Sequence, residues 1–123
     1  MNDKQVVGVL DQKVIDAFSL PLVAGAAIIC GESNKAHMKS EHPDAFLKYG
    51  DKISEIIENP TYICKHPKKD SIEYVKRFVD EDDNYVLVAV RASGSGTLFA
   101  RTLFVMDDEK VEKYYKKNAF KKY

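Results

Sequence analysis

The sequence predicts an α+β fold in which N-terminal helices pack on one face of a roughly four-stranded antiparallel sheet, with a C-terminal helix after it. Two observations lead to this fold class. Apolar residues recur at helical spacing in the first half of the chain, whereas β-branched and aromatic residues dominate four runs in the second half. Loops rich in Lys, Pro, Asp and Asn join these four runs, and short connections favour antiparallel neighbours.

The first half begins with a short strand candidate and continues through helical and apolar segments. Asp11 and Asp51 are suited to cap helices, because an Asp side chain accepts hydrogen bonds from the free N–H groups of the first turn. Gly50 marks a break between two helices, and Asn59-Pro60 ends the second of them. We therefore expect a strand at 6–10, a helix at 11–18, a buried strand at 22–30, a short helix from a cap at Ser33 or Asn34 to Ser40, and a helical pair within 43–58.

The four β-rich runs of the second half are expected at 62–65, 72–79, 85–91 and 98–106, followed by an Asp107-capped helix at 108–117. The last two runs flank a Ser-Gly-Ser-Gly turn and predict a hairpin. Its register stays open, and a slip of one residue reverses the face of every side chain. In one register Arg91 and Thr102 share a face that excludes Arg101. In a shifted register the two arginines share a face.

The bulk properties indicate an ordinary globular protein. A chain of 123 residues, 45% hydrophobic and 31% charged, is expected to form one domain, residues 1–123, around a single modest core. The formal net charge is zero, which counts against avid nonspecific nucleic-acid binding but leaves room for a local basic cleft. Cys30 and Cys64 lie in apolar surroundings and are expected to be buried free thiols. The apolar run near 20–30 is too short to span a bilayer, so no membrane association is expected.

Two arginines stand out in the predicted hairpin, because its strands otherwise consist of residues that favour burial. Arg91 lies just before the glycine turn, and Arg101 lies in the following strand among hydroxyl residues. Guanidinium groups and hydroxyls that converge can hold a phosphate or another oxyanion. Ser95 and Thr102 are the hydroxyl candidates for such a site. The alternative is an exposed hairpin whose polar side faces water.

Basic residues gather in two clusters. The middle cluster flanks a predicted strand and consists of Lys65, Lys68, Lys69, Lys76 and Arg77. Within it, Lys76 is a candidate to support a bound phosphate, and the alternative is a solvated face. The tail cluster consists of Lys113, Lys116, Lys117, Lys121 and Lys122, and for it we favour the solvated face.

The residues suited to proton transfer are two histidines and one glutamate. His37 and His42 frame the end of a predicted helix, and imidazole titrates near neutral pH, so each can act as acid or base. Glu73 lies on a predicted strand, either as a base or as an ion-pair partner of Arg77. The spacing of the histidines does not match a zinc motif, so neither a metal nor another cofactor is expected.

Several short motifs follow one another between about Ala27 and Lys117. They are Glu32-Ser33-Asn34, then HMKSEHP at 37–43, SIEYV at 71–75, VAVRASGSG at 88–96 and FARTL at 99–103. With these motifs in this order, the chain resembles the phage-associated branch of the barnase–EndoU–colicin–RelE-like (BECR) nucleases. The resemblance implies helices on a four-stranded antiparallel sheet and metal-independent RNA cleavage, often in toxins or phage-delivered effectors. It marks His37, His42, Arg91 and the Ser, Thr and Arg residues of the last hairpin as site positions.

The resulting hypothesis is a metal-independent endoribonuclease, a phage-derived toxin or effector, that works through 2′-hydroxyl attack and leaves a cyclic phosphate. Such cleavage needs a base, an acid and cations that stabilise the phosphorane-like transition state. The catalytic candidates are His37, His42, Arg91 and Glu73, and the phosphate-binding candidates are Arg101, Ser95, Thr102 and Lys76.

RNA is the expected partner, with tRNA as one candidate, and an immunity or antitoxin protein is a second candidate partner. The expected location is the cytoplasm, or a host cytoplasm after delivery by a phage. The alternative function is a non-catalytic module that binds RNA or protein through the same face. The neutral charge and the ambiguous acid–base pair favour that alternative.

Overall fold

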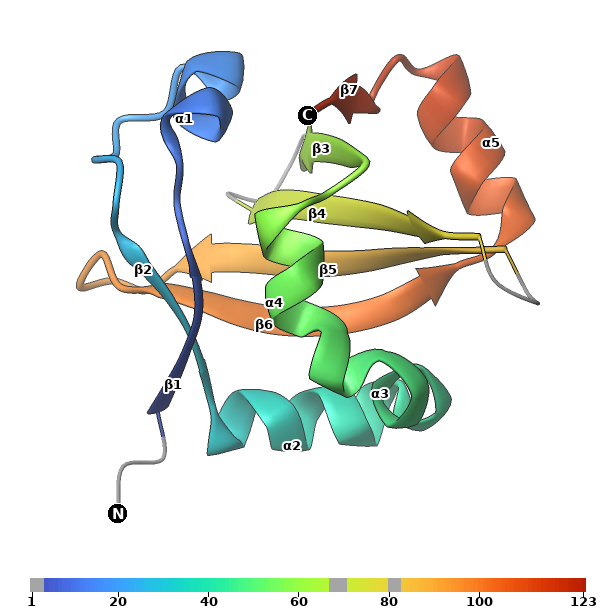
Figure 1. Cartoon of the computed structure of the whole chain (residues 1–123), viewed down its shortest axis with the longest axis horizontal. Coiled ribbons are helices and arrows are strands. Elements are labelled where there is room, and N and C mark those ends of the chain that lie inside the picture. Colours follow the sequence, from blue (N-terminus) through green and yellow to red (C-terminus); the bar gives the residue numbers. More distant parts are fainter. Residues whose placement is uncertain (1–3, 67–70, 80–82) are drawn as a thin grey trace.

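The computed structural model describes residues 4–66, 71–79 and 83–123. In this part of the chain, seven strands form one mixed sheet in the order β1-β2-β6-β5-β4-β3-β7 (Figure 1). The strands are β1 (Lys4–Val9), β2 (Ala27–Gly31), β3 (Tyr62–Lys65), β4 (Ser71–Phe78), β5 (Asn84–Ala92), β6 (Leu98–Met106) and β7 (Lys121–Lys122). The helices are α1 (Gln12–Phe18), α2 (Glu32–Glu41), α3 (Pro43–Tyr49), α4 (Ile53–Glu58) and α5 (Asp108–Lys116), with a 3-10 turn η1 (Gly50–Lys52) before α4.

The sheet corrects the architecture expected from the sequence, although the α+β class holds. Four antiparallel strands were expected, whereas the described part of the chain has seven strands that include a parallel pair. In that pair, Ile28 and Ile29 of β2 lie beside Leu98 and Phe99 of β6. β1 adds to the outer edge of β2, and the two-residue β7 adds to β3. β1 and β2 overlap the strands expected at 6–10 and 22–30. Their positions in the sheet could not be predicted, because the pairing of β2 with β6 joins segments that are distant in the chain and leaves no local sequence signal.

At the start of three helices a side-chain oxygen accepts a hydrogen bond from a backbone N–H. The carboxylate of Asp11 accepts from the N–H of Val14 at 3.0 Å, and that of Asp107 accepts from the N–H of Lys110 at 2.7 Å. Both caps were predicted. At α2 the cap is Gly31 instead, and the side chain of Asn34 accepts from its N–H at 2.9 Å.

The sheet separates two cores of unequal size. Side chains alternate along β5, so Val86, Val88 and Val90 face one side of the sheet and Leu87 faces the other. We call the first side the main-core face: it packs against α1, α2 and α4. The second side is the groove face, and its smaller core lies beneath α5.

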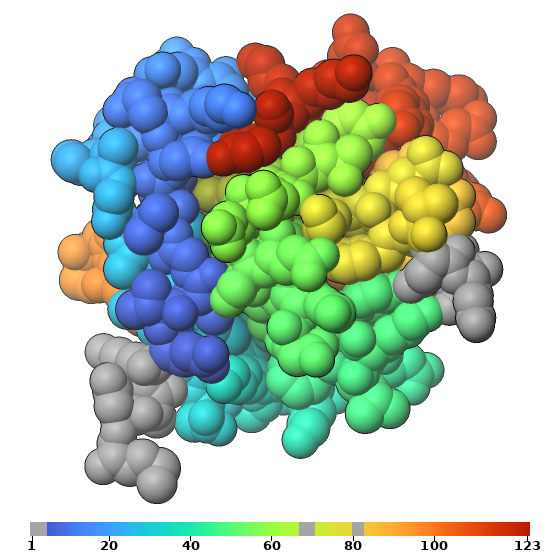
Figure 2. Space-filling view, in the orientation of Figure 1, coloured from blue at the N-terminus to red at the C-terminus, as the bar shows by residue number. Residues whose placement is uncertain are grey.

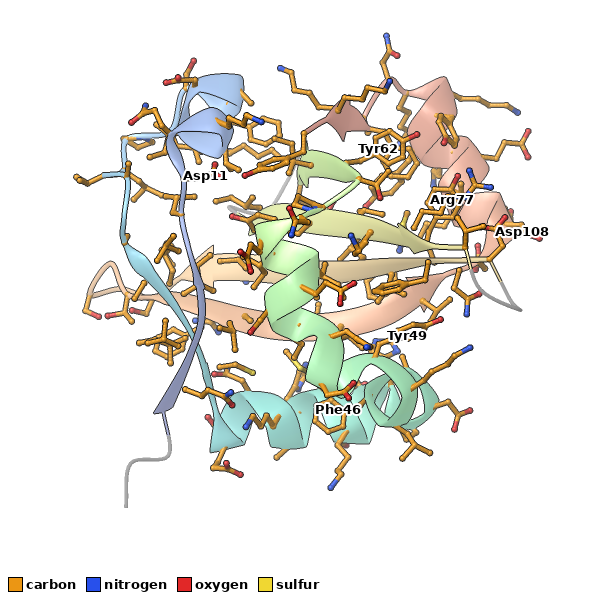
Figure 3. The ribbon with its side chains drawn as sticks, in the orientation of Figure 1. Asp11, Phe46, Tyr49, Tyr62, Arg77 and Asp108 are labelled. Carbon is orange, nitrogen blue, oxygen red and sulfur yellow. The ribbon has the colours of Figure 1, made fainter. Side chains whose placement is uncertain are left out.

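The main-core face is closed by the N-terminal half of the chain. Figure 1 shows α4 crossing the sheet, and in Figure 2 β1 and the helices α2 to α4 hide most of β5 and β6. Tyr49, at the end of α3, is 2% exposed and lies under this cover (Figure 3). Cys30 and Cys64 are both buried free thiols, as predicted. None of the helices in the described ranges has the length and apolar character needed to cross a bilayer.

Candidate functional site

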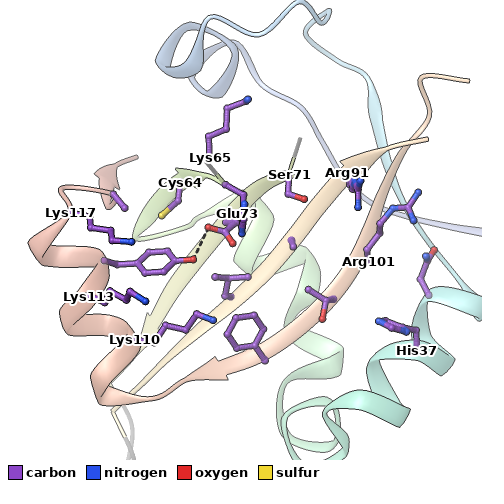
Figure 4. A pocket seen from close by; sticks show the side chains of 18 residues that line it. His37, Cys64, Lys65, Ser71, Glu73, Arg91, Arg101, Lys110, Lys113 and Lys117 are labelled. Carbon is purple, nitrogen blue, oxygen red and sulfur yellow. Dashed lines mark hydrogen bonds between the residues drawn. The ribbon is translucent and has the colours of Figure 1, made fainter. Parts of the chain in front are cut away.

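A groove of about 970 Å³ lies on the groove face of the sheet. Strands β3 to β6 form its floor, α5 forms one wall, and the start of α2 contributes to the opposite side (Figure 4). Glu73 lies on the floor, between the lysines of α5 and the arginines of the β5–β6 hairpin. The groove therefore gathers residues from both halves of the chain on the side of the sheet that the N-terminal helices leave open.

The groove is strongly basic although the chain as a whole is neutral. Among the described residues that line it, the cationic side chains are Lys65, Arg91, Arg101, Lys110, Lys113 and Lys117. Glu73 is the only acid in that lining. Cations that line a concave surface focus the electrostatic field and concentrate anions there. The net charge of zero thus conceals a surface suited to a polyanion.

A β-bulge brings the two hairpin arginines to the same face. The pairing of β5 with β6 shifts between Ala89 and Val90, which leaves Arg101 as the extra residue of the bulge. Because of this extra residue, Arg101 and its neighbour Thr102 both line the groove, together with Arg91. Neither of the two registers considered from the sequence places Arg91, Arg101 and Thr102 on one face.

The arginines of the groove differ in their partners from the arginine of β4. Arg91 and Arg101 are exposed and form no salt bridge within the described ranges. Arg77 donates two hydrogen bonds of 2.8 Å to the carboxylate of Asp83, and these lower the pKa of Asp83. A guanidinium bound in this way has fewer donors left for a ligand. The donors of Arg91 and Arg101 remain available.

Glu73 is held by a tyrosine rather than by an arginine. Its side chain is buried, and the hydroxyl of Tyr114 donates a hydrogen bond of 2.9 Å to its Oε1 atom. Burial and the charge of Glu73 raise the pKa of Tyr114, so that its hydroxyl remains a donor. The same two causes raise the pKa of Cys64 to about 12, which keeps this neighbouring thiol protonated and unreactive near neutral pH.

The structure separates the two histidine candidates. His37 projects from α2 into the lining of the groove. His42 follows the last residue of α2, and its ring lies 5.4 Å from that of Phe104. It borders a neighbouring hollow rather than the groove, and Phe104 lines both. Of the two, His37 is therefore the one placed beside the arginines.

Two of the phosphate-binding candidates lie away from the groove. Lys76 donates a hydrogen bond of 2.8 Å to the carbonyl oxygen of Asn59 at the end of α4. Ser95 lies at the tip of the hairpin, where its hydroxyl is 2.8 Å from that of Ser93 and 3.3 Å from that of Thr97. Two further lysines of the middle cluster, Lys68 and Lys69, lie outside the described residues.

Comparison with known families identifies the chain. The sequence profile of a family described as phage-Barnase-EndoU-ColicinE5/D-RelE like nuclease3 matches residues 4–113. The chain belongs to this nuclease family. The resemblance seen in the short sequence motifs is therefore confirmed, and a nuclease acts on nucleic acid. Comparison with curated proteins and with solved structures found no match.

The sequence analysis missed the wall that α5 gives to this groove. Lys110, Lys113 and Lys117 line the groove together with Tyr114, whereas the tail lysines were assigned to a solvated face. Spacings of three and four residues place such side chains on one side of a helix, and this periodicity was the available signal. His66 at the end of β3 also lines the groove and was not among the candidates.

The groove of this nuclease offers few metal ligands. Within the described ranges, no three or more His, Cys, Asp or Glu side chains lie close enough together to hold a metal ion. Stable protein metal sites take several such ligands. What the groove does contain is a carboxylate, two imidazoles and two guanidinium groups, which can serve acid–base and electrostatic catalysis.

Proposed function

We propose that this nuclease is an endoribonuclease that cleaves RNA without a metal ion, through attack of the 2′-hydroxyl on the adjacent phosphate. One observation carries the proposal: a single groove is lined by His37, Glu73, Arg91, Arg101 and Thr102. Family membership supports nucleic-acid cleavage in general. The choice of RNA and of this route is our inference from the side chains of the groove.

In the proposed reaction, Glu73 accepts the proton of the 2′-hydroxyl while the oxygen–phosphorus bond forms. The bond from phosphorus to the 5′-oxygen breaks, and His37 donates a proton to that leaving oxygen. The products are a 2′,3′-cyclic phosphate and a 5′-hydroxyl. His42 is given no part in proton transfer here, because it borders a different hollow.

Arg91 and Arg101 are proposed to hold the reacting phosphate. Negative charge grows on its non-bridging oxygens in the transition state, and guanidinium groups placed there in advance stabilise it. The absence of a carboxylate partner on either arginine within the described ranges supports this role. The hydroxyl of Thr102 can donate to a phosphate oxygen or accept from the 2′-hydroxyl.

The decisive test uses a pair of matched oligonucleotides in excess EDTA. One is all RNA, and the other carries a single 2′-deoxynucleotide on the 5′ side of the cleaved bond. We expect cleavage of the first, with a cyclic-phosphate end, and none of the second at that bond. Cleavage of both, or cleavage that needs an added divalent ion, would contradict the mechanism. Binding of both oligonucleotides without cleavage would favour the non-catalytic module.

The proposal extends to a role as a phage-derived toxin or effector that acts on RNA in a cytoplasm. Inducible expression in bacteria should then arrest growth, and Arg91→Ala should relieve the arrest at an equal protein level. An immunity or antitoxin protein would be a polypeptide whose co-expression restores growth with the wild-type chain. Normal growth with an active, soluble nuclease would refute the toxin role while leaving the enzyme proposal intact.

A further inference from the structure

We infer that α5 is a substrate-binding ridge that holds single-stranded RNA across the groove, at phosphates distinct from the one that reacts. This inference rests on the proposed function, because it extends the same site. Lys110, Lys113 and Lys117 all line the groove, and their spacing places them on one side of α5 and its C-terminal cap. Lys117 lies seven positions after Lys110, which corresponds to about 10 Å along a helix axis.

The lysines of the ridge differ from a lysine on another side of the same helix. Lys116 does not line the groove, and its ammonium lies 3.0 Å from the carboxylate of Glu112. Lys113 and Lys117 have no carboxylate partner within the described ranges. Charges on α5 are thus paired on one side and unpaired towards the groove, as expected of a surface that meets an external anion.

The ridge is fixed in position by aromatic packing behind it. The hydroxyl of Tyr115 lies 3.0 Å from that of Tyr62 and 3.2 Å from that of Tyr85. Phe120, just after the helix, stacks on Tyr62 with ring centroids 4.6 Å apart. Figure 3 shows Tyr62 and Arg77 beside α5. Because the helix is held in this way, the backbone positions of its lysines are fixed before RNA binds, which lowers the entropy cost of binding.

The arginines and the ridge lie on opposite sides of Glu73 (Figure 4). A phosphate held by Arg91 and Arg101 is therefore separated from phosphates held by the lysines. A strand of several nucleotides can contact both groups, whereas a dinucleotide that occupies the arginine side cannot reach along the ridge. The geometry thus predicts that affinity grows with substrate length and that the growth depends on α5.

The floor between the two cationic groups favours unpaired bases. It includes Leu87, Ala89 and the ring of Phe104, over which the ammonium of Lys110 lies at 4.9 Å from the centroid. A basic groove with an aromatic surface binds single strands, and a base can stack on the Phe104 ring when the ammonium of Lys110 moves from the ring to a phosphate. In a duplex the bases are stacked on each other and unavailable to such a floor.

The test measures binding without cleavage, using 2′-O-methyl RNA of two and of eight nucleotides over a range of salt concentrations. The ridge variant is K110Q/K113Q/K117Q. The matched control, K52Q/K116Q/K122Q, removes three exposed lysines that do not line the groove and changes the net charge equally. For the eight-nucleotide RNA, we expect the ridge variant to lose about tenfold or more in affinity and about two units of salt slope, at roughly 0.7 per phosphate contact. The control should stay within about twofold of wild type.

The dinucleotide separates ridge binding from a general loss of structure. Both variants should bind it as wild type does, since it does not reach α5. Equal affinity of the ridge variant and the control for the longer RNA would overturn the inference, and so would tighter binding of a duplex than of the single strand. A further outcome is that the protein binds RNA without ever cleaving it. If the ridge variant then still loses affinity for the longer RNA, the proposed catalysis is refuted and the RNA-binding role of α5 is retained.

Discussion

The two faces of the sheet differ in the partners of several of their polar side chains. On the main-core face, Lys76 donates to the carbonyl of Asn59, and Asn84 donates to the hydroxyl of Tyr49 at 3.0 Å. On the groove face, Arg91 and Arg101 have no carboxylate partner within the described ranges. The difference teaches that Lys76 and Asn84 serve the fold, whereas the two guanidinium groups of the groove remain available to a ligand.

The comparison predicts that stability and cleavage can be changed separately. The largest expected effect on stability comes from the main-core face. Leu103 of β6 is fully buried there, so Leu103→Ala should leave a cavity and lower the free energy of unfolding by about 3 kcal/mol. Urea denaturation measures this loss. Cleavage per folded molecule should remain near wild type, and a large loss of cleavage by fully folded Leu103→Ala would break the separation of the faces.

Arg91→Ala should have the largest effect on chemistry. Removing a charge that stabilises the transition state should slow single-turnover RNA cleavage about a hundredfold or more. The same change should alter the free energy of unfolding by only about 1 kcal/mol, because Arg91 is exposed and leaves no core cavity. Arg77→Ala is the matched control, since Arg77 is committed to Asp83. Equal losses of cleavage in the two variants would mean that the availability of a guanidinium does not mark the site.

Tyr114→Phe tests the role of Glu73, the one carboxylate in the described lining of the groove. The change removes the hydroxyl that donates to buried Glu73, and so alters the position of the proposed base. We expect cleavage to fall about tenfold and the free energy of unfolding to fall by about 1–2 kcal/mol. Tyr115→Phe, on the same helix, removes a hydroxyl whose hydrogen bonds within the described ranges are to Tyr62 and Tyr85. It should leave cleavage near wild type, and a larger loss than in Tyr114→Phe would contradict the role of Glu73.

The smallest expected effect is a loss of stability in alkali that involves both faces. Burial and Glu73 raise the pKa of Cys64 to about 12, and a hydrogen bond to Asp11 raises the pKa of Tyr123 to about 12. Each group loses its proton more readily in the unfolded chain, where the pKa of a thiol is about 9 and that of a phenol is about 10. The contribution is therefore complete below about pH 9 and declines as the pH rises towards 12.

Urea denaturation between pH 8 and pH 10.5 measures this decline. In Cys64→Ala the free energy of unfolding should decline less over this interval, because the contribution of the thiol is absent. A wild-type chain that becomes more stable over the same interval would show that the sign of the linkage is wrong.

Local features of the fold were predictable because they depend on neighbouring residues. The caps at Asp11 and Asp107 and the hairpin around the Ser-Gly turn follow from short motifs, and the structure confirms them. The parallel pairing of β2 with β6 was not predictable, since two short apolar segments can pair with many partners. A sheet completed by distant strands is decided by global packing, which a local pattern does not contain.

The groove was predictable in its residue types rather than in its geometry. Arg91, Arg101 and Thr102 were chosen as unusual polar residues in a hairpin, but the bulge that unites them follows from strand pairing. Lys76 was chosen for its place in a basic cluster, and strand alternation carries it to the main-core face. Lys113 and Lys117 were assigned to solvent, and Lys110 was not considered, because the sequence did not show which surface the helix covers.

The basic groove on a neutral chain means that positive charge is concentrated on one surface of the molecule. The chain has 19 basic and 19 acidic residues, and the described lining of the groove contains six of the former and one of the latter. The remaining 13 basic and 18 acidic residues leave the rest of the protein net negative. A polyanion such as RNA would therefore turn the protein until the groove faces it and be repelled elsewhere. Encounters would then be biased towards the productive orientation, without the indiscriminate retention on nucleic acid that a uniformly cationic protein suffers.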